Sequence, residues 1–262
     1  MANSTTDIRS LTFDEIKTLV AEVGEKPYRA KQLWEWLWKK HAHSWDAMSD
    51  LPKAFRAQLS ERTVLRPLVL AEEQRSADGT VKCAFKTFDG HVVEGVLIPT
   101  PTRLTACISS QIGCSLTCSF CATGKLKRIR NLEAAEIVDQ VVMIDRLAQK
   151  YHKQGLTNIV YMGMGEPLLN YANTMASAER ISAEDGLGMG ARRITVSTAG
   201  NYTVTITNAH GSLTTTPVRL TVLPAAAPRV IDSTFDPRTS VSRAPTALHA
   251  LSGDRLLVAG AQ

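Results

Sequence analysis

Residues 114–121 read CSLTCSFC and place three cysteines at the spacing C-x3-C-x2-C. No cysteine follows Cys121 in the sequence, whereas structural zinc sites generally use four protein ligands. Three thiolates can hold three irons of a 4Fe–4S cluster and leave the fourth iron open to a substrate, as catalytic metal sites do. The spacing therefore predicts a cluster held by Cys114, Cys118 and Cys121. The alternatives are a zinc site completed by a distant histidine, or unrelated buried thiols.

The composition agrees with a cytoplasmic protein that uses its thiols for metal chemistry. The 262 residues have a net charge of +5 and a pI near 9.0, which permits a nucleic-acid partner without requiring one. The segment MANSTTDIRSLTF lacks the apolar stretch of a signal peptide, and no apolar run reaches membrane-spanning length. Four of the five cysteines fall between residues 107 and 121, which favours reduced thiols over a disulfide framework.

Apolar periodicity outside the cysteine stretch indicates an α/β fold. It predicts helices over 11–24, 28–41, 53–62, 131–150 and 171–183. Alternating or continuous apolar runs predict strands over 81–88, 91–98, 103–110, 157–163 and 192–198. Strand and helix alternate in the second half of this region, so its last three strands are expected to be parallel.

The composition changes after Gly200, because the remaining residues contain no Lys, Glu, Cys, Trp or Met. This tail predicts one hairpin with its turn at 208–212, the linker PAAAP (224–228), and a second hairpin over 247–260. It resembles fragments of bacterial immunoglobulin-like domains and of surface β-repeats, which have too few strands here to close a core. We therefore interpret the chain as a hybrid, in which a truncated α/β sequence is joined to an unrelated β-rich one. We expect the third parallel strand to be an edge strand with unpaired backbone groups.

We accordingly expect four segments. They are an N-terminal helical domain (1–65), a β extension with a hairpin (66–105), an α/β segment with three parallel strands (106–200) and a short all-β tail (201–262).

Four motifs together resemble a known family over about residues 10 to 200. They are KPYRAKQLWEWLW (26–38), HVVEGVLIP (91–99), TACISSQIGCSLTCSFCATG (105–124) and NIVYMGMGEPLLN (158–170). In this order they resemble the radical S-adenosylmethionine (SAM) enzymes that methylate carbon 2 of an adenine in 23S ribosomal RNA and in transfer RNA. The resemblance implies a radical-SAM partial barrel, a 4Fe–4S cluster and SAM as cofactors.

The resemblance also implies which residues bind SAM. In GMGEP, Gly163 and Gly165 would let the backbone approach the cofactor, and Glu166 would accept a hydrogen bond from its ammonium group. Ser197 would contact SAM from the end of the third parallel strand. Taken alone, GMGEP also suits a plain turn before a helix, with Pro167 at the first helical position.

Two catalytic roles follow from the resemblance. Glu94 matches the proton acceptor of the family, and Cys107 matches the cysteine that resolves a covalent protein–RNA adduct. From the residues alone, Glu94 suits the solvent face of a strand and Cys107 a buried strand position. Cys83 matches no catalytic position and is expected to pack in the core.

An RNA partner agrees with two further features. Four tryptophans lie among basic residues, at Trp34, Trp36, Trp38 and Trp45, and the run KLKRIR (125–130) follows the cysteines. Stacking on aromatic rings and phosphate contacts from Lys and Arg suit ribosomal and transfer RNA. Taken singly, these features are better interpreted as a helical core and a solvated face. An electron donor protein is a further implied partner, and no membrane is expected.

The family uses a second cysteine near its C-terminus as the carrier of the methyl group, and none lies after Cys121 here. We therefore expect this chain to bind the cluster and SAM without transferring a methyl group to RNA. The alternatives are methylation at carbon 8 of adenine, a surface or adhesion protein, and a zinc-binding RNA module without catalysis.

Overall fold

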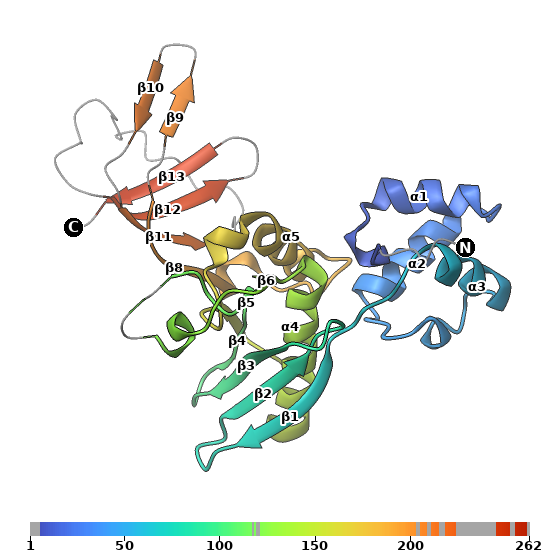
Figure 1. Ribbon diagram of the computed structural model, residues 1–262, viewed down its shortest axis with the longest axis horizontal. Helices are drawn as coiled ribbons and strands as arrows, with labels where there is room; N and C mark the ends of the chain where they lie inside the picture. Colours follow the sequence, from blue (N-terminus) through green and yellow to red (C-terminus); the bar gives the residue numbers. More distant parts are fainter. Residues whose placement is uncertain are drawn as a thin grey trace.

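The computed structural model describes residues 6–116, 118, 121–202, 205–208, 211–214, 218–223, 245–251 and 255–260. Figure 1 shows the amino-terminal helices in one group, a sheet with further helices beside it, and β-strands toward the carboxyl terminus. This arrangement confirms the predicted fold class, in which helices come first, an α/β region follows and β-structure ends the chain.

The amino-terminal helices form where the apolar spacing predicts them. They are α1 (Phe13–Glu22), α2 (Tyr28–Trp38) and α3 (Lys53–Arg62), with the 3-10 turns η1 (Ile8–Ser10) and η2 (Trp45–Ala47). A capping box begins α1: Thr12 Oγ1 accepts from the Glu15 amide at 3.3 Å, and a Glu15 carboxylate oxygen accepts from the Thr12 amide at 2.7 Å. The second helix ends three residues before the predicted boundary, and the backbone turns left-handed at His41, with φ at 50°.

The large sheet has the strand order β1-β2-β3-β4-β7-β8-β11-β12-β13. Its first six strands are β1 (Val69–Arg75), β2 (Val81–Lys86), β3 (Val92–Pro99), β4 (Leu104–Cys107), β7 (Asn158–Tyr161) and β8 (Ile194–Tyr202). Strands β1 to β4 are antiparallel, whereas β4, β7 and β8 are parallel, as predicted. The chain passes from β4 to β7 through α4 (Ala134–His152) and from β7 to β8 through α5 (Tyr171–Ser182).

One face of this sheet packs against α4, and the other face is more exposed. Gly95 on β3 lies against the helix, because a Cβ built there would be 3.0 Å from a side-chain carbon of Ile144. Side chains alternate along a strand, so the neighbours of Gly95 point to the opposite side. Cross-strand register brings Val96, Cys107, Val160 and Thr195 into one row on that side. We call it the open face and define it by Glu94, Val96, Cys107, Val160, Thr195 and Ser197.

Strand β1 is an element that the sequence pattern did not predict. Its sequence, VLAEEQR, has no regular alternation, and its side chains are exposed or only partly buried. A register shift between Leu70 and Glu72 further interrupts its pairing with β2. Because neither face of β1 is fully buried, periodicity carries no signal for it.

The tail contains two hairpins, but the strands of the first extend into the predicted turn 208–212, since Asn208 pairs with Gly211. Strand β9 (Thr205–Asn208) pairs with β10 (Gly211–Thr214), and β12 (Pro245–Leu251) pairs with β13 (Arg255–Gly260). The predicted linker PAAAP lies outside the described residues. The expectation of a bare edge on the third parallel strand was wrong, because β11 (Val218–Leu223) pairs antiparallel with β8. An apolar, β-branched segment of the tail satisfies the backbone groups of that edge.

A buried ion-pair network joins the helical domain to α4. The Arg9 guanidinium donates to both Asp139 carboxylate oxygens, at 2.8 and 2.9 Å, and pairs with Asp7 at 3.2 Å. Arg9 is only 6% exposed. Burial alone would lower the pKa of Arg9, but Asp139 and Asp7 together raise it. Trp34 adds a second contact by donating to Asp185, beyond α5, at 2.8 Å.

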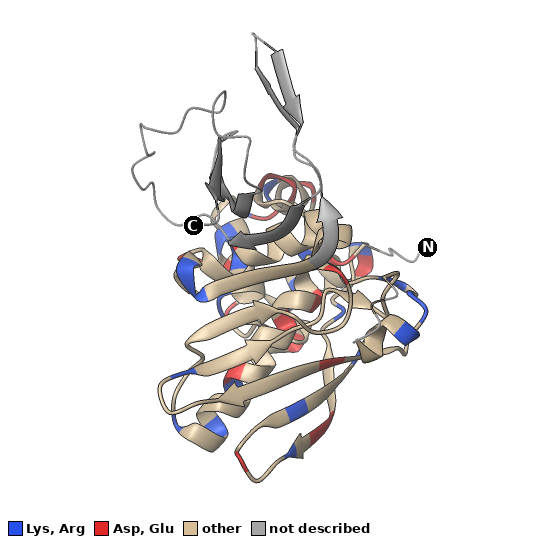
Figure 2. Cartoon of the chain, turned by 90° about the vertical axis from the view of Figure 1, so that its left-hand side faces the viewer, with Lys and Arg blue, Asp and Glu red and all other residues tan. Residues whose placement is uncertain are grey.

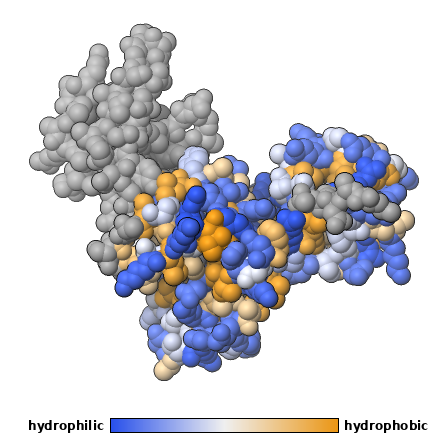
Figure 3. All heavy atoms as spheres, viewed as in Figure 1, coloured by the Kyte–Doolittle hydropathy of each residue, from blue (hydrophilic) through white to orange (hydrophobic). Residues whose placement is uncertain are grey.

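The four tryptophans of the helical domain belong to its packing. Trp38 is buried, and Trp34, Trp36 and Trp45 are partly buried against the core. Figure 3 shows a mostly hydrophilic surface over the described part of this domain in that view. The interpretation of these side chains as part of a helical core is therefore confirmed, whereas base stacking on the partly exposed rings of Trp34, Trp36 and Trp45 stays a prediction. Among the described residues, no helix is both long and apolar enough to span a bilayer.

Candidate cofactor site

The cysteine loop is closed at its base by a narrow neck. Short strands β5 (Gln111–Ile112) and β6 (Arg130–Asn131) pair there, and the Cys114 amide donates to the Leu126 carbonyl at 3.3 Å. At Gly113 φ is +73°, and an added Cβ would lie 2.2 Å from the Lys127 carbonyl oxygen, so only glycine allows this approach. The loop therefore leaves and returns to the sheet at one point, beside the carboxyl end of β4.

All three predicted cluster ligands lie on this loop as free, partly exposed cysteines. The Cys121 amide donates to the Cys118 carbonyl at 3.1 Å, and the turn continues into η3 (Ala122–Lys125). In the part of the chain that the structure describes, no three or more Cys, His, Asp or Glu side chains are gathered as a metal site. The structure thus places the three thiols on one loop without bringing their sulfurs together. Three thiols on a short, partly exposed loop are nevertheless the donor chemistry that an iron–sulfur cluster requires.

The GMGEP loop follows β7 and leads into η4 (Pro167–Asn170), so it lies at the same edge of the sheet as the cysteine loop. A Cβ at Gly163 would lie 2.7 Å from the Ile108 carbonyl oxygen and from Ser109 Oγ. At Gly165, φ is +94° and a Cβ would lie 2.4 Å from Gln111 Cβ. The space beside both glycines is therefore taken by residues 108–111 of the same chain. The close packing of these residues requires glycine at both positions. The sequence analysis had instead explained the two glycines by the approach of the cofactor.

Glu166 is buried, at 3% exposure, directly after Gly165. One of its carboxylate oxygens accepts from the Leu168 amide at 3.2 Å and so caps η4, in which Pro167 occupies the first turn. Ser197 lies on β8 and is partly exposed on the open face. The roles of these residues toward SAM stay predictions.

Glu94 and Cys107 both lie on the open face. The Glu94 carboxylate is about half exposed, at 49%, and forms an ion pair with Lys82 Nζ at 2.7 Å. Burial raises the pKa of the Cys107 thiol, and a hydrogen bond from the Met162 amide partly offsets that rise. Cys83 instead faces the core, where burial and the charge of Glu73 raise its pKa to about 12, which confirms its expected packing role.

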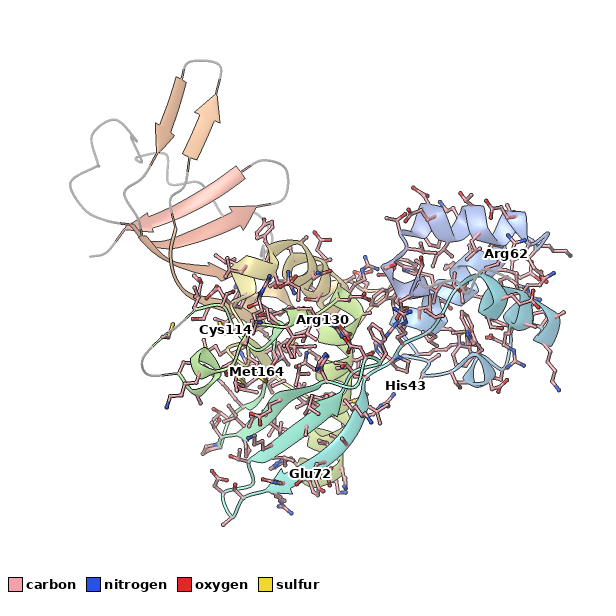
Figure 4. The ribbon with its side chains drawn as sticks, in the orientation of Figure 1. His43, Arg62, Glu72, Cys114, Arg130 and Met164 are labelled. Atoms are coloured by element: carbon pink, nitrogen blue, oxygen red, sulfur yellow. The ribbon has the colours of Figure 1, made fainter. Side chains whose placement is uncertain are left out.

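The basic run 125–130 divides into two parts. Lys125, Lys127 and Arg128 are exposed, whereas Arg130 is partly buried in ion pairs with Asp89 and Glu136, each at 2.7 Å. The hydrogen bonds that Arg130 donates to Glu136 and Asp89 raise its pKa despite its burial. Arg130 thus fixes the β2–β3 hairpin tip to α4 and is not part of an exposed basic surface. Figure 4 shows its place near the loop of Cys114, and Figure 2 shows Lys and Arg interspersed with Asp and Glu over the described elements.

Sequence reasoning missed a set of buried or partly buried polar side chains behind these loops. They are Ser109, Gln111, Asn131, Gln140 and Asn170. Gln140 Nε2 donates to the Ser109 carbonyl at 3.0 Å, and its Oε1 accepts from the Ser109 amide at 2.9 Å. Asn170 Nδ2 donates to the carbonyls of Ser110 and Leu132, both at 2.8 Å. The signal was a polar triplet, SSQ (109–111), directly after an apolar strand.

Comparison with known proteins agrees with this geometry. Residues 6–65 match the family described as ribosomal RNA large subunit methyltransferase N-terminal domain, and residues 108–209 match the radical SAM superfamily. A probable dual-specificity RNA methyltransferase RlmN from Cytophaga hutchinsonii is 51% identical over 193 residues, which are 74% of this chain and 53% of the relative. The dual-specificity RNA methyltransferase RlmN from an Anaeromyxobacter species is 47% identical over 198 residues, with 74% and 52% covered.

A solved structure is similar over the same region. The crystal structure of a radical SAM methyltransferase from Sphaerobacter thermophilus superimposes with a TM-score of 0.67 at 45% identity, covering 74% of this chain and 57% of that one. The chain thus spans about half the length of the curated relatives that it matches. Over roughly its first 200 residues, where both family matches and the solved structure coincide, the chain belongs to the family of radical SAM methyltransferases that includes RlmN.

Proposed function

We propose that this chain forms the cluster-binding and SAM-binding part of an enzyme that methylates carbon 2 of an adenine in ribosomal and transfer RNA. The observation that supports the proposal most is a convergence at one edge of the sheet. The cysteine loop follows β4, GMGEP follows β7, and the open face between them contains Glu94, Cys107 and Ser197. Ligands of parallel α/β sheets bind at the carboxyl ends of the strands.

The cofactors fit the residues at this edge by their chemistry. Cys114, Cys118 and Cys121 would hold the 4Fe–4S cluster, and Gly163, Gly165, Glu166 and Ser197 would line the SAM site. When bound, the cluster and SAM supply the radical chemistry and the methyl group. Burial of Glu166 strengthens any contact that its carboxylate makes with a cationic group, because the surroundings screen charge less than water does.

Glu94 and Cys107 would act on the RNA from the open face. The half-exposed Glu94 carboxylate is held by Lys82 at 2.7 Å, so it is an available proton acceptor with a defined position. The Cys107 thiol is the nucleophile expected to resolve a covalent adduct. Its raised pKa limits its thiolate fraction at neutral pH.

The proposed partners are ribosomal RNA, transfer RNA and an electron donor protein, in the cytoplasm. Within the proposed division, residues 1–65 would contact RNA, 66–105 would extend the sheet, 106–200 would bind the cofactors, and 201–262 would be an unrelated tail. Exposed Lys125, Lys127 and Arg128 beside the cysteine loop support contact with phosphates. The partly exposed rings of Trp34, Trp36 and Trp45 would be available for base stacking in this contact.

We infer that this chain does not complete methyl transfer, because its sequence has no cysteine after Cys121 to carry the methyl group. The test is anaerobic incubation of reconstituted protein with SAM, a reductant and unmodified ribosomal RNA, followed by mass spectrometry of the nucleosides. The expected result is SAM binding without 2-methyladenosine. Detection of 2-methyladenosine would overturn the inference of inactivity, and 8-methyladenosine would overturn the assignment to carbon 2.

A further inference from the structure

The segment that leads into the cysteine loop is fastened to the GMGEP loop through its backbone. The Gly163 amide donates to the Ile108 carbonyl at 2.9 Å, and the Ser110 amide donates to the Met164 carbonyl at 2.9 Å. Figure 4 shows Cys114 and Met164 in the same part of the molecule. The two loops proposed to hold the cluster and SAM therefore share one support.

Two buried side chains of this segment extend the connection. Ser109 Oγ accepts from the Met164 amide at 2.8 Å and donates to the Glu94 carbonyl at 2.6 Å. Gln111 Oε1 accepts from the Glu166 amide at 2.9 Å, while its Nε2 donates to Asn131 Oδ1 at 2.7 Å. Both ends of the Gln111 amide are thus used, and the residue is fully buried. A buried amide with both ends paired has a single preferred orientation.

The contact between Gln111 and the GMGEP loop is also tight in the steric sense. Gly165 has φ at +94° and presents its bare Cα to Gln111, since an added Cβ would lie 2.4 Å from Gln111 Cβ. The Gln111 side chain therefore packs against the loop at Gly165 and accepts a hydrogen bond from the amide of the next residue, Glu166. The hydrogen bond at Glu166 and the van der Waals contact at Gly165 together fix the position and the orientation of the backbone at these two residues.

We propose that Gln111 is a positioning residue, which sets the place of the Glu166 backbone relative to the segment that leads into the cysteine loop. Ser109 has the same function at Met164, because its hydroxyl group links the Met164 amide to the Glu94 carbonyl. The consequence for SAM binding rests on the proposed function of Glu166, whereas the positioning itself does not. Nothing in the roles implied by the family resemblance had included either side chain.

The test compares Gln111→Leu with Gln140→Leu. Both glutamines are fully buried, but the hydrogen bonds of Gln140 go to the backbone of Ser109 and Glu136 rather than to Glu166. Hydrogen exchange is measured on the full chain without cofactors, each protein at the same interval below its own unfolding temperature. The Glu166 amide is expected to exchange about tenfold faster in Gln111→Leu, which corresponds to the loss of one hydrogen bond, and to be unchanged in Gln140→Leu. Unchanged exchange in Gln111→Leu, or an equal increase in both variants, would overturn the proposal.

A second measurement separates this inference from the proposed function. Equilibrium dialysis of SAM against anaerobically reconstituted protein is expected to show about tenfold weaker binding for Gln111→Leu than for Gln140→Leu. If Glu166 exchange accelerates while SAM affinity stays the same, the positioning role stands and the role of Glu166 in SAM binding is wrong. If the unsubstituted chain binds no SAM, the proposed function fails, and the exchange rates still decide the role of Gln111.

Discussion

Arg9 joins the helical domain to α4 through a buried ion-pair network. Its guanidinium lies between Asp7 and Asp139, with all three side chains buried. Arg9→Ala leaves two buried carboxylates without their cation, so we expect the free energy of unfolding to fall by about 3–5 kcal/mol. Denaturant titration followed by circular dichroism measures this change.

The matched control for Arg9 is an exposed ion pair of the same domain. Lys17 pairs with Asp14 at 2.9 Å, and both side chains are more than half exposed. Lys17→Ala is expected to change the free energy of unfolding by no more than about 1 kcal/mol, because water and salt screen such pairs. Similar losses in the two variants would show that the buried network does not join the domains as described.

Asp89 gives the hairpin tip a defined pH dependence. Its hydrogen bonds to Arg130 and Thr87 lower the pKa of the carboxyl well below its ordinary value of 3.8. A carboxyl whose pKa is depressed on folding contributes stability above its unfolded pKa, and that contribution is lost as the pH falls below it. We therefore expect the unfolding temperature to fall between about pH 4 and pH 2 by less in Asp89→Asn than in the unsubstituted protein. Parallel curves for the two proteins would contradict this account.

At the scale of elements, the GMGEP loop depends on a close approach between two chain segments. Gly165 and Gly24 both have positive φ, but only Gly165 has atoms of the chain where a Cβ would lie. Gly24→Ala is expected to cost about 1–2 kcal/mol from backbone conformation alone. Gly165→Ala is expected to cost a further 1–3 kcal/mol from overpacking against Gln111. Thermal unfolding of the pair measures the difference, and equal losses would exclude the close approach.

The elements with a strong apolar period could be predicted from the sequence. The third helix has its predicted boundaries, and the capping box at Thr12 and Glu15 fixes the start of the first. Strand β1 could not be predicted, because no side of it is fully buried. The pairing of β11 with β8 could not be predicted either, because it joins segments whose sequences suggest different origins.

The candidate site could be predicted only in part. The positions of Glu94 and Cys107 on one face follow from alternation along β3 and β4 and from their register. The supporting role of Gln111 could not be read from the sequence, since it depends on the packing of two loops that are far apart in the chain. The requirement for glycine at position 165 could not be predicted either, because it arises from the contact of the same two loops.

At the scale of the whole molecule, the chain combines a helical domain, part of a parallel sheet and a β-rich tail (Figure 1). Three parallel strands, β4, β7 and β8, bring the cysteine loop and the GMGEP loop to one edge. The open face, which runs from β3 to β8, is bordered by β1 and β2 on one side and by β11 on the other. The loops that carry the proposed cofactor ligands therefore lie at one edge of the sheet, although the described residues do not gather the three thiols as a metal site.

The central claim is that Cys114, Cys118 and Cys121 together hold a 4Fe–4S cluster. It is tested most directly by anaerobic reconstitution with iron and sulfide, followed by metal analysis and absorption spectroscopy of single Cys→Ala variants. The unsubstituted protein and the control Cys83→Ala are expected to be brown and to contain equal iron and sulfide, whereas alanine at any of the three loop positions is expected to lose the colour. A colourless unsubstituted protein, tightly bound zinc, or an unchanged spectrum in a loop variant would contradict the account.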